Sequence, residues 1–200
     1  MASLAIGSAE KAPNDEKHLD QSGVEVCSVS VRVENQEKLG NFVLKQLESE
    51  ANRILATGGA AIHVTFVAAG RADYTLQVQD FAPRNNVEGD ILGQTFKQDP
   101  RNSYLFIKTI EEVWHQTQSL PRGGRGVVYA RVYAHELAAH GILGWVHSQA
   151  ADKDMGFLGS GKNWSGFLFN NLDDTKFEFS RSSGKLLNTR CRIMNHVAGS

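Results

Sequence analysis

The alternation of apolar and polar residues predicts a strand near the start of the chain and a long helix after it. Residues 24–33 largely alternate, which is typical of a strand with one buried face. Over residues 36–57 the apolar residues recur mostly every three or four positions, which predicts an amphipathic helix. We expect Asn35 to be its N-cap and the glycine pair at 58–59 to end it.

Four more strands and two more helices are predicted from the same kinds of pattern. The stretch at 103–110 is strongly apolar, whereas the stretch at 91–96 gives a weak signal. A loop rich in glycine and proline at 121–126 leads into an apolar helix that carries three histidines. A short final helix is expected over 181–194, with Ser180 as its cap. The predicted strands are 62–67, 74–81, 91–96 and 103–110.

The length and composition fit a single globular domain with a tail. The chain has 200 residues, of which 41% are hydrophobic, and this is enough for a substantial buried core. Its net charge of −1 argues neither for nor against a polyanionic partner. No apolar run approaches the length of a membrane span. Residues 1–22 are mostly polar and aperiodic, so we predict a flexible leader there, or the stub of a longer parent protein.

The candidate chemistry lies in one segment, where three of the seven histidines and one glutamate fall within thirteen residues. Neutral imidazoles are the commonest protein ligands for zinc, and a catalytic zinc site uses three protein ligands and one open position. His135, His140 and His147 are the candidate ligands, and Glu136 is the candidate general base. The segment is therefore interpreted as a hydrolytic zinc site.

The spacing of the first two histidines requires an irregular helix. The common zinc-protease helix places two histidines four residues apart, but His135 and His140 are five residues apart. At about 100° per residue they would lie roughly 140° apart around a regular helix, too far to share a metal. One extra residue can be absorbed in a π-bulge. We predict such an irregularity between Glu136 and His140, near the small residues Ala138 and Ala139.

The segment resembles the metzincin metalloprotease motif His-Glu-x-x-His-x-x-Gly-x-x-His, with one residue added before the second histidine and one before the glycine. Gly144 and His147 keep the family's offset of three residues. Glycine suits the left-handed turn that ends the helix in that family. The sequence His-Glu-x-x-x-His is also similar to the zinc motif of the dipeptidyl peptidase III family, which takes a downstream glutamate as third ligand. No matching acidic helix occurs in this sequence, so His147 is the better third ligand.

The resemblance implies an α+β fold in which a twisted mixed sheet packs on two long helices. The expected order of elements agrees with the N-terminal subdomain of metzincins. Residues 23–147 would form that subdomain with the zinc helix, and residues 148–200 would form a small C-terminal subdomain. The weak strand would lie at the edge of the sheet over the cleft. There, Leu92, Gly93 and Gln94 would hold an extended peptide by main-chain bonds.

Two methionines and two cysteines leave alternatives open. Metzincins place a methionine turn beneath the zinc, and Met155, next to a glycine, is favoured for it over Met194, which only six residues follow. Cys27 and Cys191 are the only cysteines, and they fit either a disulfide or two buried thiols.

The functional hypothesis is a zinc-dependent endopeptidase in which Glu136 takes a proton from the attacking water and passes it to the leaving amine. A catalytically inactive metzincin-like peptide-binding module and a zinc hydrolase of another amide bond are the alternatives. We expect a monomer that acts on a protein or peptide substrate and has no nucleic-acid or membrane partner. The small size and polar leader favour a toxin or effector domain, secreted or injected, over a cytoplasmic peptidase.

Overall fold

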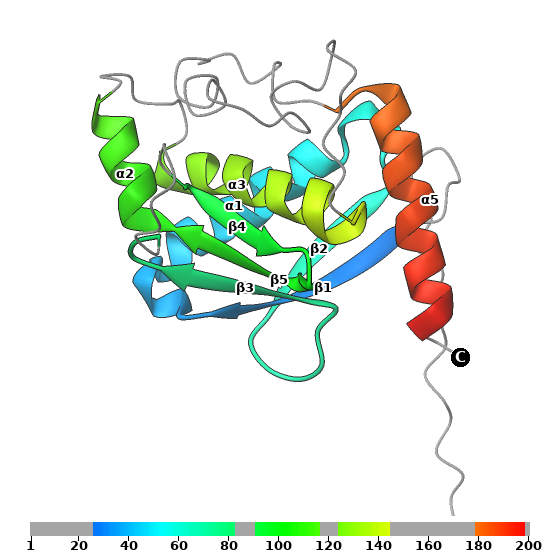
Figure 1. Cartoon of the computed structure of the whole chain (residues 1–200), viewed down its shortest axis with the longest axis horizontal. Helices are drawn as coiled ribbons and strands as arrows, with labels where there is room; N and C mark the ends of the chain where they lie inside the picture. The colour runs from blue at the N-terminus through cyan, green and yellow to red at the C-terminus, as the bar shows by residue number, and fades with distance from the viewer. Residues whose placement is uncertain (1–25, 83–90, 117–123, 145–178, 199–200) are drawn as a thin grey trace, which may run out of the picture.

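The chain has an α+β fold built around one five-stranded sheet (Figure 1). The computed structural model describes residues 26–82, 91–116, 124–144 and 179–198. The strand order across the sheet is β2-β1-β3-β5-β4, and β4 runs antiparallel to β5 while the other pairs are parallel. The strands are β1 (Cys27–Glu34), β2 (Ile62–Val67), β3 (Tyr74–Gln79), β4 (Gly93–Phe96) and β5 (Asp99–Phe106).

One face of the sheet is covered by helices. Every second residue of β1 from Cys27 onward is buried, while Ser28 and Arg32 between them are exposed. The buried positions of β2 and β3 also alternate. Helices α1 (Gly40–Leu55) and α3 (Arg125–His135) pack against each other over the buried face (Figure 1). A mixed sheet on two helices confirms the predicted fold class.

The first helix begins later than predicted. A 3₁₀ turn, η1 (Gln36–Lys38), precedes α1, and the N-cap of α1 is Leu39, which makes no side-chain capping bond. Asn35 adopts a left-handed conformation with a φ of 58°, which asparagine tolerates. Its Nδ2 donates to the carbonyl oxygen of Val78 at 3.2 Å. The prediction of Asn35 as N-cap is wrong, because its amide instead links the end of β1 to β3.

The strand predicted at 103–110 is wrong in its second half. β5 ends at Phe106, and helix α2 (Ile107–Gln116), which the sequence analysis does not predict, follows at once. Ile110 and Val113 are buried three residues apart, as on one face of a helix. A short apolar run of this kind cannot be told from a strand by periodicity alone. The other predicted strands after α1 agree with β2, β3 and β4 to within two residues at either end.

Strand β2 forms one edge of the sheet, and side chains of α1 close that edge. The side chain of Asn52 binds both main-chain groups of Val64, accepting from the amide at 2.7 Å and donating to the carbonyl oxygen at 2.8 Å. Oε1 of Glu48 accepts from the amide of Phe66 at 2.6 Å. These bonds satisfy main-chain groups that an edge strand would otherwise present to another chain.

The last helix, α5 (Arg181–Ala198), is attached to the first strand of the sheet. Ser180 caps it as predicted, because its Oγ accepts from the amide of Ser183 at 3.2 Å. A disulfide joins Cys191 of α5 to Cys27 of β1, which decides between the two alternatives for these cysteines. The helix continues four residues beyond its predicted end.

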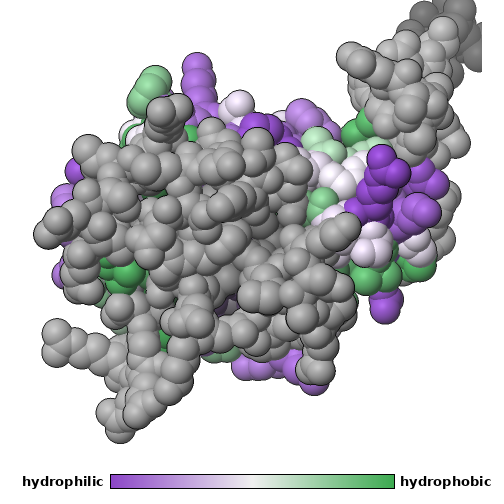
Figure 2. All heavy atoms as spheres, turned by 90° about the horizontal axis from the view of Figure 1, so that it is seen from above, coloured by the Kyte–Doolittle hydropathy of each residue, from purple (hydrophilic) through white to green (hydrophobic). Residues whose placement is uncertain are grey.

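Among the described helices, none combines the length and the apolarity needed to cross a lipid bilayer. In the view of Figure 2, the described surface mixes hydrophilic and hydrophobic side chains. The leader predicted at residues 1–22, and residues 148–178 of the predicted C-terminal subdomain, lie outside the described residues.

Two glycines allow α5 to approach the turn η2 (Thr57–Gly59) closely. A Cβ atom at Gly184 would lie 2.3 Å from the carbonyl oxygen of Gly58, and one at Gly58 would lie 2.4 Å from the carbonyl oxygen of Ser180. Backbone atoms cannot move aside as the end of a flexible side chain can. A side chain at position 184 must therefore push α5 away from η2.

We expect Gly184→Ala to destabilise the protein by about 1–3 kcal/mol, although alanine is the better helix former. Urea unfolding measures this change, and Lys185→Ala at the exposed neighbouring position is the matched control. A Gly184→Ala protein at least as stable as the wild type would contradict the close contact with η2.

Candidate metal centre

Helix α3 passes directly into a π-helix, η3 (Glu136–Ile142). The amide of Leu143 donates to the carbonyl oxygen of Ala138, five residues back, at 3.0 Å. This confirms the irregularity predicted from the histidine spacing, although it extends over seven residues rather than a single bulge. Ala138 and Ala139 are fully buried, so small side chains occupy the widened turn.

The π-helix brings His135 and His140 to the same side. Their ring centroids are 5.1 Å apart, with the ring planes at 83°. Together with Glu136 they form a buried group in which one ligand atom from each residue lies within 4.8 Å of the others. Two imidazole nitrogens and one carboxylate oxygen at these separations can hold a metal ion. The structure therefore brings together three of the predicted site residues.

The end of the π-helix has the predicted glycine conformation. Gly144 has a φ of 70°, in the left-handed region, two residues after η3 ends. The third predicted ligand, His147, lies outside the described residues, as does Met155.

The Glu136 carboxylate is held by two hydrogen bonds at one oxygen. Its Oε2 lies 2.6 Å from Nδ1 of His140 and accepts from Oγ1 of Thr95 at 2.8 Å. Burial would raise the pKa of Glu136, but the two hydrogen bonds and the charges of the neighbouring imidazoles hold this pKa below its usual value. The side chain is therefore ionised at neutral pH and acts as a hydrogen-bond acceptor.

Sequence reasoning misses two residues of this site, Thr95 and Ser103. They lie opposite each other in β4 and β5, their hydroxyl oxygens are 3.0 Å apart, and both are fully buried. A signal for them exists in the strand pattern. Ser103 faces the same side of β5 as the buried Leu105, and a buried hydroxyl needs a hydrogen-bond partner. A polar residue at such an inward-facing position points to a site.

Strand β4 lies at the edge of the sheet, as predicted for the weak strand. The amide of Phe106 donates to the carbonyl oxygen of Leu92 at 3.0 Å, so Gln94 also belongs to a hydrogen-bonded pair of this antiparallel ladder. The main-chain groups of Gly93 and Thr95 therefore point away from β5, and no other described strand pairs with them. Of the predicted peptide-binding residues, Gly93 lies on this free edge, Gln94 bonds to β5, and Leu92 is buried just before β4.

Met194, the alternative candidate for a methionine turn, lies within helix α5 rather than in a turn. The hydroxyl of Tyr74 donates to its Sδ at 3.4 Å. The ring of Tyr74 also packs closely on η3, because a Cβ atom at Gly141 would lie 3.1 Å from Cε1 of Tyr74. Tyr74 therefore connects Met194 to the π-helix.

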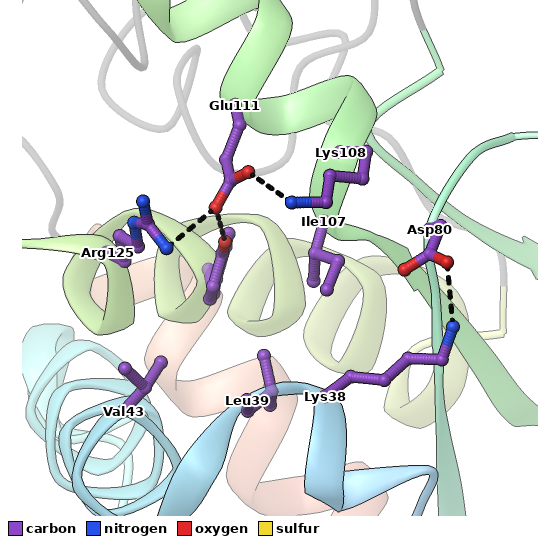
Figure 3. Close-up of a pocket in the computed structure, with 9 residues that line it drawn as sticks. Lys38, Leu39, Val43, Asp80, Ile107, Lys108, Glu111 and Arg125 are labelled. Carbon is purple, nitrogen blue, oxygen red and sulfur yellow. Dashed lines mark hydrogen bonds and ion pairs between the residues drawn. The ribbon is translucent and has the colours of Figure 1, made fainter.

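A pocket of about 260 Å³ is lined by side chains of η1, α1, α2 and α3 (Figure 3). Its charged side chains pair with one another: Lys38 lies 3.0 Å from Asp80, and Glu111 lies 3.1 Å from Lys108 and 3.2 Å from Arg125. Arg125 and His135 are the first and last residues of α3. Ten residues of helix separate positions by about 15 Å along the axis. The pocket is therefore not part of the metal centre.

Comparison of the sequence with known protein families matches no family model, and comparison with curated proteins finds no match. The site is therefore characterised by its own geometry: an α+β fold carries a His-Glu-x-x-x-His group that can hold a metal ion.

Gly93 leaves space for the side chains of Val132 in α3 and Glu136 in η3, which lie beneath β4. A Cβ atom at this position would lie 2.7 Å from Cγ1 of Val132 and 3.2 Å from Oε1 of Glu136. We expect Gly93→Ala to lower the free energy of unfolding by about 1–3 kcal/mol, as measured in urea. Gln94→Ala, on the opposite face of the same strand, is the matched control. A Gly93→Ala protein as stable as the wild type would contradict the close contact between β4 and η3.

Proposed function

We propose that this protein is a zinc-dependent endopeptidase with His135, Glu136 and His140 at the centre of its active site. The observation that carries the proposal is the buried group of two imidazoles and one carboxylate, with ligand atoms within 4.8 Å of one another. The π-helix that forms the group contacts β4, whose outer edge has no strand partner among the described residues. A metal group next to a free strand edge suits the hydrolysis of an extended peptide.

The donor set suits zinc. Zinc takes imidazole nitrogen as a ligand at about 2.0–2.1 Å, and catalytic sites use three protein ligands. We propose His135 and His140 as two of them and, on the resemblance to metzincins, His147 as the third. A zinc ion held there would act as a Lewis acid, lowering the pKa of a water molecule and polarising the scissile carbonyl.

Glu136 is the proposed general base. Its carboxylate is ionised at neutral pH, so it can accept a proton and return it to the leaving amine. Both of its hydrogen bonds, with Thr95 and His140, use Oε2. We propose Oε1, which neither of these bonds uses, as the oxygen that takes the proton.

The order of elements supports a metzincin-like assignment within this proposal. Strand, helix, four strands and metal helix follow one another as expected for that family, with α2 as an addition. The fourth strand lies at the sheet edge. The first of the two residues added to the family's motif falls within the π-helix.

The substrate is proposed to pair with β4 as an added strand. The main-chain groups of Gly93 and Thr95 point outward along this edge. The opposite edge of the sheet is closed by Asn52 and Glu48, which bind the main chain of β2. At β4, an extended peptide therefore finds main-chain donors and acceptors that no described strand pairs with, whereas the corresponding groups of β2 are bound by α1.

A metal-free peptide-binding module is the second candidate function. The bond between Nδ1 of His140 and Oε2 of Glu136 favours it, because it pairs these two atoms without a metal. Such a module would use the same free edge of β4 but would not hydrolyse the bound peptide.

The zinc content of the protein distinguishes the endopeptidase from the metal-free module. We expect the wild type, loaded with zinc and dialysed, to hold about one zinc per chain by inductively coupled plasma mass spectrometry, as a catalytic site does. His140→Ala should lose the metal because it removes one ligand. His63→Ala, an exposed position on β2, is the control and should keep it. A wild type without zinc would contradict the peptidase and favour the metal-free module.

Removing the proposed base should separate catalysis from metal binding. We expect Glu136→Ala to lower peptide hydrolysis by about 10²- to 10⁴-fold while zinc content stays at the wild-type level. Mass spectrometry of a digested peptide library measures the cleavage. Glu112→Ala, at an exposed position on α2, should leave activity unchanged. Hydrolysis near the wild-type rate in Glu136→Ala would exclude Glu136 as the base.

A further inference from the structure

We propose that Thr95 is a positioning residue that fixes the Glu136 carboxylate, and that Ser103 fixes Thr95 in turn. This inference rests on the proposed role of Glu136 as general base. Thr95 belongs to β4, and Glu136 is the first residue of η3, so their contact joins the edge strand to the metal helix. Oγ1 of Thr95 lies 2.8 Å from Oε2 of Glu136, and both side chains are buried.

The chemistry of the three groups decides which of them donates. Oγ1 of Thr95 donates to Oε2 of Glu136, and a threonine hydroxyl has a single hydrogen. That hydrogen is used in the bond to Glu136. The hydroxyl of Ser103, 3.0 Å from Oγ1 of Thr95, must then be the donor in the second bond. The hydrogen bonds thus run in one direction, from Ser103 through Thr95 to Glu136, and each strengthens the next.

The backbone of the sheet holds this chain of hydrogen bonds in place. Thr95 and Ser103 lie directly opposite each other in a non-hydrogen-bonded pair, the arrangement in which cross-strand side chains come closest. The pairing of β4 with β5 is regular up to Thr95 and shifts register after it. Two residues earlier, Gly93 faces the same side without a side chain, which leaves room for the carboxylate of Glu136.

Thr95 therefore connects the proposed substrate strand to the general base Glu136. The main-chain groups of Thr95 point to the free edge, where the proposed substrate strand pairs, while its side chain holds Oε2 of Glu136. One residue thus sets both the register of the peptide and the position of the carboxylate that acts on it. Thr95 influences the reaction through Glu136 and is not itself a catalytic residue.

The test compares Thr95→Val, Thr95→Ser and Thr109→Val in the zinc-loaded full chain. Valine keeps the shape of threonine without the hydroxyl, whereas serine keeps the hydroxyl. Thr109 is the matched control, because it is also buried and its Oγ1 accepts from the amide of Ala82 at 3.3 Å rather than contacting Glu136. A quenched fluorescent peptide, chosen among those that the wild type cleaves in a library, gives kcat and KM.

We expect Thr95→Val to lower kcat by about 10- to 100-fold, the usual effect of losing a residue that orients an active-site group. KM and zinc content should stay close to the wild type, and Thr95→Ser should recover most of kcat. Thr109→Val should lower stability without this selective loss of kcat. Equal kcat for Thr95→Val and Thr109→Val would overturn the proposal, as would a Thr95→Ser protein no faster than Thr95→Val.

A double-mutant cycle in the zinc-free protein tests the contact without any activity measurement. Urea unfolding is compared for Thr95→Val, Glu136→Ala and the protein that carries both changes. We expect the effect of Thr95→Val on the unfolding equilibrium constant to differ by at least about threefold between the wild-type and Glu136→Ala backgrounds. Additive effects would overturn the proposal.

The two sets of results also separate this inference from the proposed function. A wild-type chain that neither holds zinc nor cleaves peptides would contradict the endopeptidase, and the double-mutant cycle would still decide whether Thr95 holds Glu136. An active wild type with additive effects in the cycle would retain the endopeptidase and reject the role of Thr95.

Discussion

The wide helical turn between His135 and His140 is the constraint on which the rest of the site depends. Residues five apart face the same way only where hydrogen bonds reach the fifth residue back, and π-helices of this kind are rare. Packing compensates for the unusual backbone. Leu137, Ala138 and Ala139 are fully buried between the sheet and the neighbouring helices. An unusual backbone that tight packing maintains is found most often at a functional position.

The two edges of the sheet differ in how the main-chain groups of their outer strands are bonded. Asn52 and Glu48 occupy the main chain of β2, so that edge is closed. The free edge of β4 lies next to η3, and its inward-facing Thr95 reaches the Glu136 carboxylate. Behind the π-helix, α5 is tied to β1 by the Cys27–Cys191 disulfide. The group of His135, Glu136 and His140 thus lies between helix α5 and strand β4, and no described strand pairs with the outer edge of β4.

Local pattern predicts much of this arrangement, and its failures have two causes. Alternation and helical periodicity locate β1 to β4 and α1, and the five-residue spacing of His135 and His140 predicts the π-helix. Periodicity fails at α2, because a short apolar run suits a strand and a buried helix equally well. The Cys27–Cys191 disulfide joins residues 164 positions apart, and the bond from Thr95 to Glu136 joins residues 41 apart. Such contacts depend on how elements far apart in the sequence pack together, which no local pattern specifies.

The central claim is that the π-helix places the imidazoles of His135 and His140 so that both bind one zinc ion. Long-range ¹H–¹⁵N correlation spectra of the imidazole rings test it directly, because metal binding changes the shifts of the ring nitrogens that it involves. Adding one equivalent of zinc should shift the ring nitrogens of His135 and His140 together and leave those of the exposed His63 and His115 unchanged. A shift at only one of His135 and His140, or at neither, would contradict the claim.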